Sequence, residues 1–137
     1  MKISKRAEYG LSAMVFLARN ASRNNASELA KNKHIISIRE ISNTEGIPFS
    51  FLSKIFGDLE KAKLVKGKHG ANGGYVLAKD SKKITAKDVV ELLENTTSVD
   101  CRLCGKSKKC LTKNVWRKID LAIEKTLKNI TLQDLIK

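Results

Sequence analysis

The sequence has no hydrophobic run long enough to cross a membrane, and we expect it to carry no export signal. No segment approaches the roughly 20 consecutive apolar residues that span a bilayer. The stretch MKISKRAEYGLSAMVFLARNA has the basic start of a secretory signal, but Glu8 interrupts it and its apolar part is short. We therefore expect a cytoplasmic protein without a membrane partner. The apolar residues of this stretch instead recur at helical spacing, at Ala7, Leu11, Met14, Val15 and Ala18.

Acidic residues are scarce as well. The 137 residues include 14 acidic and 27 basic ones, which gives a formal net charge of +13. This excess favours a polyanionic partner, either nucleic acid or an anionic membrane face, and the alternative is a merely basic solvated surface. A hydrophobic content of 42% is enough for the core of one domain, or of a small domain with an appended element.

Proline occurs once, and it lies at the centre of a predicted helix-turn-helix. Ser37 and Glu40 have the spacing of a capping box, which predicts that a short helix starts there. Gly46 and Pro48 then break the pattern. Such a helix pair is typical of DNA-binding proteins, but it also occurs as ordinary core. The second helix is predicted from apolar residues at i, i+3, i+4 and i+7, namely Leu52, Ile55, Phe56 and Leu59.

A basic, glycine-rich hairpin is predicted directly after the helix pair. Leu64 to Lys68 and Tyr75 to Ala78 have the composition of strands, and the glycines between them allow a tight loop. A helix pair followed by such a hairpin is a winged helix. Four lysines place positive charge where a wing would meet DNA phosphates, at Lys61, Lys63, Lys66 and Lys68.

The remaining chain is predicted to contain two loops and two helices. Arg19 to His34 is polar and predicts a loop, whereas the cap spacing of Thr85 and Asp88 predicts a helix over Ala86 to Glu94. The cysteine segment follows as the second loop. A long helix then begins at Asn114, with an apolar stripe at Trp116, Ile119, Ile123, Leu127 and Ile130.

Few residues follow this long helix that could cover its apolar stripe, which indicates a dimer partner. The alternative is that the long helix folds back on the first helix of the same chain. The elements together predict a mostly α fold with a small β-hairpin wing, in which a winged helix-turn-helix precedes a long C-terminal dimerisation helix. We expect the DNA-binding domain to cover residues 1–84, and the cysteine loop with the dimerisation helix to cover residues 85–137.

Cysteine is absent except in VDCRLCGKSKKCLTKNVW, which holds Cys101, Cys104 and Cys110. An odd number of thiols in a reducing compartment is typical of metal binding or redox sensing rather than of disulfides. The CxxC spacing lets two sulfurs reach one metal, and Cys110 is near enough to supply a third ligand. From Cys101 to Lys118 there are seven basic residues and no acidic one, which favours thiolates.

Several kinds of site remain open from these residues alone. Structural zinc and iron–sulfur clusters both usually take four protein ligands, and one is missing locally. A bare thiol switch and simple packing residues are the other interpretations. Catalysis is not favoured, because the sequence has no nucleotide-binding glycine loop, no Ser-His-Asp arrangement and no acid pair. An electron carrier is a competing class, and so is a zinc-stapled RNA-binding module, which does not explain the hairpin.

Three stretches carry a resemblance to a known family. MKISKRAEYGLSAM, IPFSFLSKIFGDLEKAKLVKGKHGANGGYVLA, and KCLTKNVWRKI with LKNITLQDLI resemble the IscR/NsrR group of bacterial iron–sulfur regulators, in the Rrf-two superfamily of winged-helix transcription factors. The C-terminal run is closest to IscR. The resemblance covers nearly the whole chain and implies a homodimeric regulator, such as a repressor, on a double-stranded, near-palindromic DNA operator. It would sense iron–sulfur status, nitric oxide or redox state.

The resemblance implies that Cys101, Cys104 and Cys110 ligate an iron–sulfur cluster, with a 2Fe–2S form favoured and 4Fe–4S the alternative. The family commonly spaces its cysteines five residues apart, whereas the first gap here is two residues, and Lys113 replaces a ligand histidine of IscR. Some relatives resembling NsrR use a carboxylate from the other subunit at the eighth position. Glu8 is therefore a candidate fourth ligand or else a surface residue. A thiol-based or zinc-binding regulator without a cluster is the alternative function.

The resemblance also implies DNA contacts on the second helix and on the wing. A lysine pairs with guanine acceptors, serine hydroxyls pair with several base edges, and a phenylalanine contacts a thymine methyl or a sugar. His69 stands where the family often has an arginine for the minor groove, which leaves more of the backbone attraction to the wing lysines. The predicted DNA-binding residues are Ser50, Phe51, Ser53 and Lys54 on the helix, and Lys66, Lys68, His69 and Asn72 on the wing.

Overall fold

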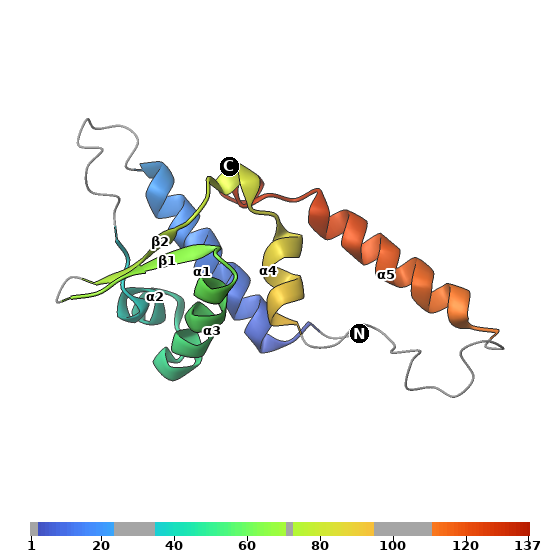
Figure 1. Ribbon diagram of the computed structural model, residues 1–137, viewed down its shortest axis with the longest axis horizontal. Coiled ribbons are helices and arrows are strands. Elements are labelled where there is room, and N and C mark those ends of the chain that lie inside the picture. The colour runs from blue at the N-terminus through green and yellow to red at the C-terminus, as the bar shows by residue number, and fades with distance from the viewer. Residues whose placement is uncertain (1–2, 24–34, 71–72, 95–110) are drawn as a thin grey trace.

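The structure, a computed structural model, consists of a packed body from which one helix runs outward (Figure 1). It describes residues 3–23, 35–70, 73–94 and 111–137. It confirms the predicted mostly helical fold with a two-stranded wing. The elements in chain order are α1 (Lys5–Arg23), α2 (Ile38–Glu45), α3 (Phe49–Lys61), β1 (Val65–Lys68), β2 (Gly74–Leu77), the short 3-10 helix η2 (Ser81–Lys83), α4 (Ala86–Leu93), α5 (Lys113–Lys128) and α6 (Leu132–Leu135).

The helix α1 supplies one broad face of the core. Leu11 and Val15, which the sequence pattern assigns to the core stripe, are only half-buried and lie at its edge. The helix starts at a cap, since the Ser4 hydroxyl accepts a hydrogen bond from the Ala7 N–H at 3.2 Å. The fully buried residues of α1 recur at helical spacing and include Ala7, Ala13, Met14, Leu17 and Ala18.

The predicted loop from Arg19 to His34 is wrong for residues 19–23, which continue α1. Leu17 and Ala18, in the preceding turn, are buried in the core. The Asn20 side-chain amide donates a hydrogen bond to the Phe16 carbonyl at 2.8 Å. Extending a formed helix by a turn costs little once its apolar face is packed, so polar composition alone misplaced the boundary. Residues 24–34 of that predicted loop lie outside the described part of the chain.

The helix-turn-helix forms as predicted. The Ser37 hydroxyl accepts a hydrogen bond from the Glu40 N–H at 3.1 Å and caps α2. Gly46 ends α2 with a φ of 68°, a left-handed conformation that glycine adopts without strain. The Ser42 hydroxyl donates to the Ile47 carbonyl at 2.5 Å and closes the turn before α3. All four predicted core residues of α3 are buried, namely Leu52, Ile55, Phe56 and Leu59.

The wing is an antiparallel pair in which Val65 lies opposite Leu77 and Lys68 opposite Gly74. Its two strands begin and end within one residue of their predicted limits. A third segment joins the hairpin: the Ile36 N–H donates to the Tyr75 carbonyl at 3.1 Å, and the Tyr75 N–H donates to the Ile36 carbonyl at 2.8 Å. This bridge, which the sequence did not predict, anchors the wing beside the start of α2.

The helix α4 packs closely against α1. A Cβ atom at Gly10 would lie 2.0 Å from Leu93 Cδ1, so a larger residue there would force the buried Leu93 side chain to shift. The predicted capping box at the start of α4 is complete, because the Thr85 hydroxyl accepts from the Asp88 N–H and the Asp88 carboxylate accepts from the Thr85 N–H.

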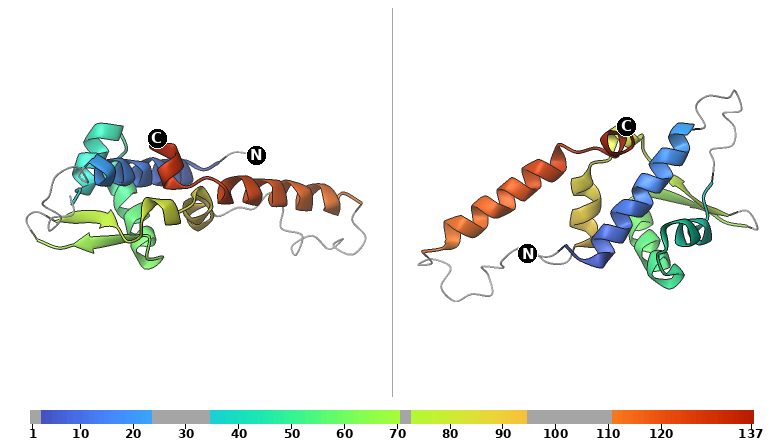
Figure 2. Two further views of the ribbon diagram at one scale, coloured as in Figure 1. Left: turned by 90° about the horizontal axis from the view of Figure 1, so that it is seen from above. Right: turned by 180° about the vertical axis from the view of Figure 1, so that it is seen from behind.

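The C-terminal region leaves the body and returns to it. Figure 2 shows α5 running away from the body while α6 lies back against it. The helix α5 lies beside α4, where Lys87 and Glu124 form an ion pair at 3.0 Å, so in the described chain it does not fold back along α1. Ile130 falls just after the helix, and its carbonyl accepts from the Ala86 N–H at 2.7 Å. Leu132 is then fully buried in the core.

The predicted division into residues 1–84 and 85–137 stays a prediction. Elements on its two sides pack together, since α4 contacts α1 and α3, and α6 contacts η2 and α1. Among the described residues, no helix combines the length and apolar content needed to span a membrane.

Candidate nucleic-acid interface and sensor segment

The recognition helix α3 presents most of its predicted base-facing residues to solvent. Ser50 and Lys54 are exposed, and Ser53 is half-buried with its hydroxyl donating to the Phe49 carbonyl at 3.1 Å. Phe51 has a different position: its ring packs edge-on against Tyr9 of α1, with the ring centres 5.6 Å apart. The helix therefore offers a lysine and two hydroxyls, while Phe51 fastens it to α1.

The wing presents its predicted DNA-binding residues to solvent. Lys66, Lys68 and His69 are all exposed, and neither lysine forms an ion pair with any described residue. Free ammonium groups on a protruding hairpin are suited to phosphate oxygens. Asn72, the remaining predicted residue of the wing, lies outside the described part of the chain.

The structure also brings together two residues that the sequence analysis missed. Arg39 of α2 lies over the ring of Phe49, the first residue of α3, with its guanidinium carbon 5.2 Å from the ring centre. Phe49 lies three residues before Leu52, so helical spacing assigns it to the core, yet 46% of it is exposed. Its exposure depends on how the first turn of α3 projects from the body, which no local pattern reports.

The first turns of α1 connect the recognition helix to the end of α4. The Arg6 guanidinium pairs with the Asp58 carboxylate of α3, while Arg6 Nε is buried without a hydrogen-bond partner in the described chain. The Ser4 N–H donates to the Glu94 carboxylate at 2.8 Å. One end of α1 thus contacts both α3 and Glu94, the last described residue before the cysteines.

The three cysteines, Cys101, Cys104 and Cys110, lie outside the described residues. The chain before them ends at Glu94, beside the start of α1, and the described chain resumes at Leu111, at the outer end of α5. Leu111 is almost fully exposed, and the Trp116 indole N–H donates to the Thr112 hydroxyl at 3.3 Å. Within the described ranges, no group of three or more His, Cys, Asp or Glu side chains could hold a metal ion.

Glu8 is exposed on the first turn of α1. Its carboxylate accepts a hydrogen bond from Lys5 at 3.2 Å, and 55% of its side chain is accessible. This hydrogen bond and the charge of Glu8 raise the pKa of Lys5. A surface ion pair of this kind is weak, so the carboxylate can exchange its partner at little cost.

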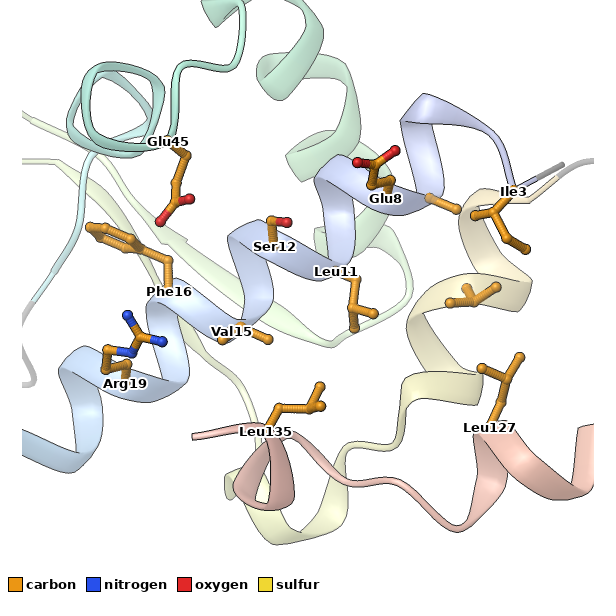
Figure 3. A pocket seen from close by; sticks show the side chains of 12 residues that line it. Ile3, Glu8, Leu11, Ser12, Val15, Phe16, Arg19, Glu45, Leu127 and Leu135 are labelled. Carbon is orange, nitrogen blue, oxygen red and sulfur yellow. The ribbon is translucent and has the colours of Figure 1, made fainter. Parts of the chain in front are cut away.

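Glu8 also lies at the rim of an apolar groove along α1. The groove has a volume of about 670 Å³. Figure 3 shows Leu11, Leu127 and Leu135 pointing into the same space from α1, α5 and α6. Glu45 of α2 lies at the rim further along. The groove is therefore a mainly apolar surface with a carboxylate at each of two positions.

The comparisons with known proteins agree with this architecture. The family described as Rrf2, iron-dependent transcriptional regulator, matches residues 3–137. The chain belongs to the Rrf2 family. The HTH-type transcriptional regulator IscR of Sodalis glossinidius is 32% identical to it over 142 residues, which cover 99% of this chain and 79% of that protein. The family and its IscR relatives are described as transcriptional regulators, not as enzymes. This chain is therefore a DNA-binding winged-helix regulator of the Rrf2 family.

Solved structures of the family include two kinds of regulator. IscR of T. potens has a TM-score of 0.77 with 31% identity, covering 99% of this chain and 86% of its own. CymR, the global cysteine regulator of B. subtilis, has a TM-score of 0.78 with 29% identity, covering 99% of this chain and 96% of its own. Since the two scores are nearly equal, the fold alone does not distinguish an IscR-like from a CymR-like regulator.

Proposed function

We propose that this Rrf2-family chain is a homodimeric transcription regulator whose DNA binding is controlled by an iron–sulfur cluster at Cys101, Cys104 and Cys110. The observation that carries the proposal is the grouping of every thiol of the chain directly before α5, in a segment rich in positive charge. The cluster state would be the signal, and the winged helix would be the output.

Dimerisation through α5 is supported by its unfinished packing. No residue of this 16-residue helix is fully buried, and Val115, Leu121 and Ile123 are 50%, 57% and 38% exposed. The apolar groove along α1 is close to the same helix at Leu127. A second copy would cover both surfaces, since an isolated helix of this length is marginal in water.

The dimer provides a reason to assign the fourth ligand to Glu8 of the partner subunit. The residues that follow the cysteines, Leu111 and Thr112, lie at the outer end of α5, whereas Glu8 lies at the groove near its inner end. The distance along the helix axis from the start of α5 to Leu127 is about 20 Å. A partner packed along α5 would bring its own Glu8 toward the outer end of this helix.

The donor groups fit an iron–sulfur cluster chemically. Thiolate is the usual iron ligand in such clusters, and the exposed carboxylate of Glu8, whose partner in the described chain is Lys5, is available as the fourth. Lys113, the residue at the position of the IscR histidine, is a cation and donates no lone pair. When bound, the cluster would supply redox and nitric oxide reactivity; the protein residues would hold it and transmit its presence to α3.

The proposal is tested by anaerobic purification, an absorption spectrum, and iron, sulfide and zinc analysis. We expect brown protein with stoichiometric iron and sulfide, and loss of both in Cys110→Ala. Both cluster types contain equal iron and sulfide, so the number of iron atoms per chain distinguishes the 2Fe–2S form from the 4Fe–4S form. Colourless protein that takes up no iron on reconstitution would contradict a cluster.

Glu8 has a matched control in the same groove. We expect Glu8→Ala to shift the cluster spectrum and shorten its lifetime in air, whereas Glu45→Ala, which removes another groove carboxylate, should leave both unchanged. Equal spectra and lifetimes for the two variants would remove Glu8 from the ligand set without affecting the cysteines.

We further propose that Ser50, Ser53 and Lys54 of α3 read bases, with Phe51 near a thymine methyl or a sugar. On the wing, Lys66 and Lys68 would bind the backbone, His69 would lie at the minor groove, and Asn72 is assigned to the same wing. Lys54→Ala should weaken binding to a duplex selected from a random library and reduce discrimination against unselected DNA. Lys68→Ala should weaken both equally and reduce the salt slope by about one unit. Equal losses on both duplexes for both variants would contradict this division of roles.

A thiol-based or zinc-binding regulator is the second candidate, because the CymR structures match the fold as well as IscR does. One of them is titled an oxidised form, from Staphylococcus aureus, with a TM-score of 0.76. Zinc in the purified protein, or DNA binding that responds to peroxide without iron, would favour this candidate over the cluster.

A further inference from the structure

Arg39 and Phe49 form a cation–π pair on the outer surface of the helix-turn-helix. The guanidinium carbon lies 5.2 Å from the ring centre, within the range of an attractive interaction. Arg39 belongs to the first turn of α2 and Phe49 begins α3, so the pair joins the first turns of the two helices. Both residues are exposed, and within the described chain Arg39 forms no ion pair.

The pair is not part of the core. Leu52, one turn further along α3, is fully buried, whereas 46% of Phe49 is exposed. The contact with the ring restricts the guanidinium, and because Arg39 is exposed its N–H groups remain accessible to solvent. A planar guanidinium held in this way loses less side-chain entropy when it binds an oxyanion, and it matches a phosphate with two parallel hydrogen bonds.

The position of the pair identifies the oxyanion. In a helix-turn-helix the first helix crosses the DNA backbone while the second enters the major groove. Arg39 is on the first helix, and Phe49 is adjacent to Ser50, a proposed base-facing residue of the second. A guanidinium at this place would lie over the strand that borders the groove.

We propose that Arg39 binds a backbone phosphate and that Phe49 is the positioning residue that holds it there. This inference rests on the proposed DNA interface and extends it to α2. Phosphate contacts carry no sequence information, so the pair would set the position of α3 on the duplex and strengthen binding to any DNA sequence.

The first test is the salt dependence of Arg39→Ala on a fixed mixed-sequence duplex, for which no operator need be known. We expect about a tenfold weaker affinity at moderate salt, because a charge-assisted hydrogen bond is lost. The slope of log affinity against log salt should fall in magnitude by about 0.9 for each bound subunit. Arg117→Ala on α5 makes the same charge change away from α2 and α3 and should alter the slope by less than half as much.

The second test separates charge from positioning. Arg39→Lys and Phe49→Leu should both keep the slope of the unaltered protein, since the cation remains, while weakening affinity about threefold through loss of the stack. The double variant should bind no more weakly than Arg39→Lys alone, because the ring acts only through the guanidinium. Thermal midpoints should be unchanged in all of them.

The outcomes distinguish this inference from the proposed function. If Lys54→Ala and Lys68→Ala weaken DNA binding while Arg39→Ala behaves like Arg117→Ala, the phosphate contact is wrong and the regulator stands. Lower thermal midpoints with an unchanged salt slope would identify the pair as a structural link between α2 and α3, which also overturns the inference. An unaltered protein with no salt-dependent affinity for duplex DNA would overturn both.

Discussion

The body and α5 differ in how completely a single chain packs them. In the body, α1, α3 and α4 each bury several apolar side chains completely, and the short α6 adds Leu132 to the same core. The helix α5 has a comparable apolar stripe but buries no residue fully. Apolar periodicity therefore predicts a helix equally well in both regions. Only in the body does the same chain supply the surfaces that cover the apolar side chains of the helix.

Each region also has an ion pair that joins two elements, and the two pairs are similarly exposed. In the body, the partly buried Arg6–Asp58 pair joins α1 to α3. The link between the body and α5 is the pair of Lys87 and Glu124, whose hydrogen bond raises the pKa of Lys87. A pair near the surface contributes little to stability, so the attachment of α5 depends on its apolar contacts.

The largest effect is expected from a core substitution in the body. Phe56 is fully buried and stacks against Tyr75 with ring centres 4.7 Å apart. Phe56→Ala should lower the free energy of unfolding by about 3–5 kcal/mol, measured by urea titration. Ile123→Ala on α5 should cost less than about 1 kcal/mol at a protein concentration that keeps the chain monomeric. Equal costs would mean that α5 is already packed in a single chain.

The next effect concerns association rather than folding. Ile123 is 38% exposed and borders a shallow hollow on α5. Ile123→Glu should weaken the proposed dimer by about 100-fold, because an unpaired carboxylate would be buried at the contact. Sedimentation velocity over a concentration series measures this, with Ile123→Leu as the conservative control. A dimer that tolerates Ile123→Glu would place the contact on another surface.

The close crossing of α1 and α4 predicts an intermediate effect. Gly10→Ala should destabilise the body by about 1–3 kcal/mol, because the new methyl group overlaps Leu93. Gly57→Ala in α3 is the matched control: its Cβ meets no atom within 4 Å, so the substitution should stabilise the helix by about 0.5–1 kcal/mol. Thermal unfolding of the two variants should therefore shift in opposite directions.

A smaller effect is expected at the tie between α1 and the recognition helix. The Arg6 and Asp58 side chains are 32% and 34% exposed, so their coupling in a double-mutant cycle should be about 1 kcal/mol after allowance for solvent screening. The more exposed Lys5–Glu8 pair should give less than about 0.5 kcal/mol. Coupling energies of the same size would show that the partial burial of the Arg6 pair has no consequence.

The smallest effect is expected at the C-terminal cap. Hydrogen bonds from the backbone and hydroxyl of Thr131 lower the pKa of Asp134. A carboxylate whose pKa is lowered by folding stabilises the structure above its unfolded pKa, and this contribution is lost as the pH falls through the folded pKa. The protection factors of the α6 amides, which correct for the intrinsic pH dependence of exchange, should therefore fall in acid below about pH 4. Asp134→Asn should show reduced protection already at neutral pH and little further loss in acid.

Much of the fold could be predicted because its signals are local. The stripe of α3, the cap at Ser37 and the complete box at Thr85 and Asp88 all involve residues within one or two turns of one another. The second complete capping box, at Thr131 and Asp134, has the same spacing and was not recognised in the sequence. Local hydrogen bonds of this kind form wherever the spacing permits, so a sequence pattern is enough to find them.

The candidate site likewise contains residues that the sequence could predict and residues that it could not. The resemblance to the family selected Lys54, Lys66 and Lys68, which the structure leaves exposed and unpaired within the described chain. Neither periodicity nor the resemblance pointed to Arg39 and Phe49. These two residues are ten positions apart on different helices, and their contact exists only because the turn between α2 and α3 sets the angle of the helices.

By itself, the sequence determined the positions of most helices, the winged hairpin, the strong positive charge and the single thiol segment, because composition and short-range spacing contain this information. Only the tertiary structure decided that α1 extends to Arg23, that Ile36 joins the wing, that Leu132 returns to the core and that α5 remains largely uncovered. Each of these features depends on contacts between residues far apart in the chain. The energy of such contacts depends on the packing of whole elements, which no local pattern reports.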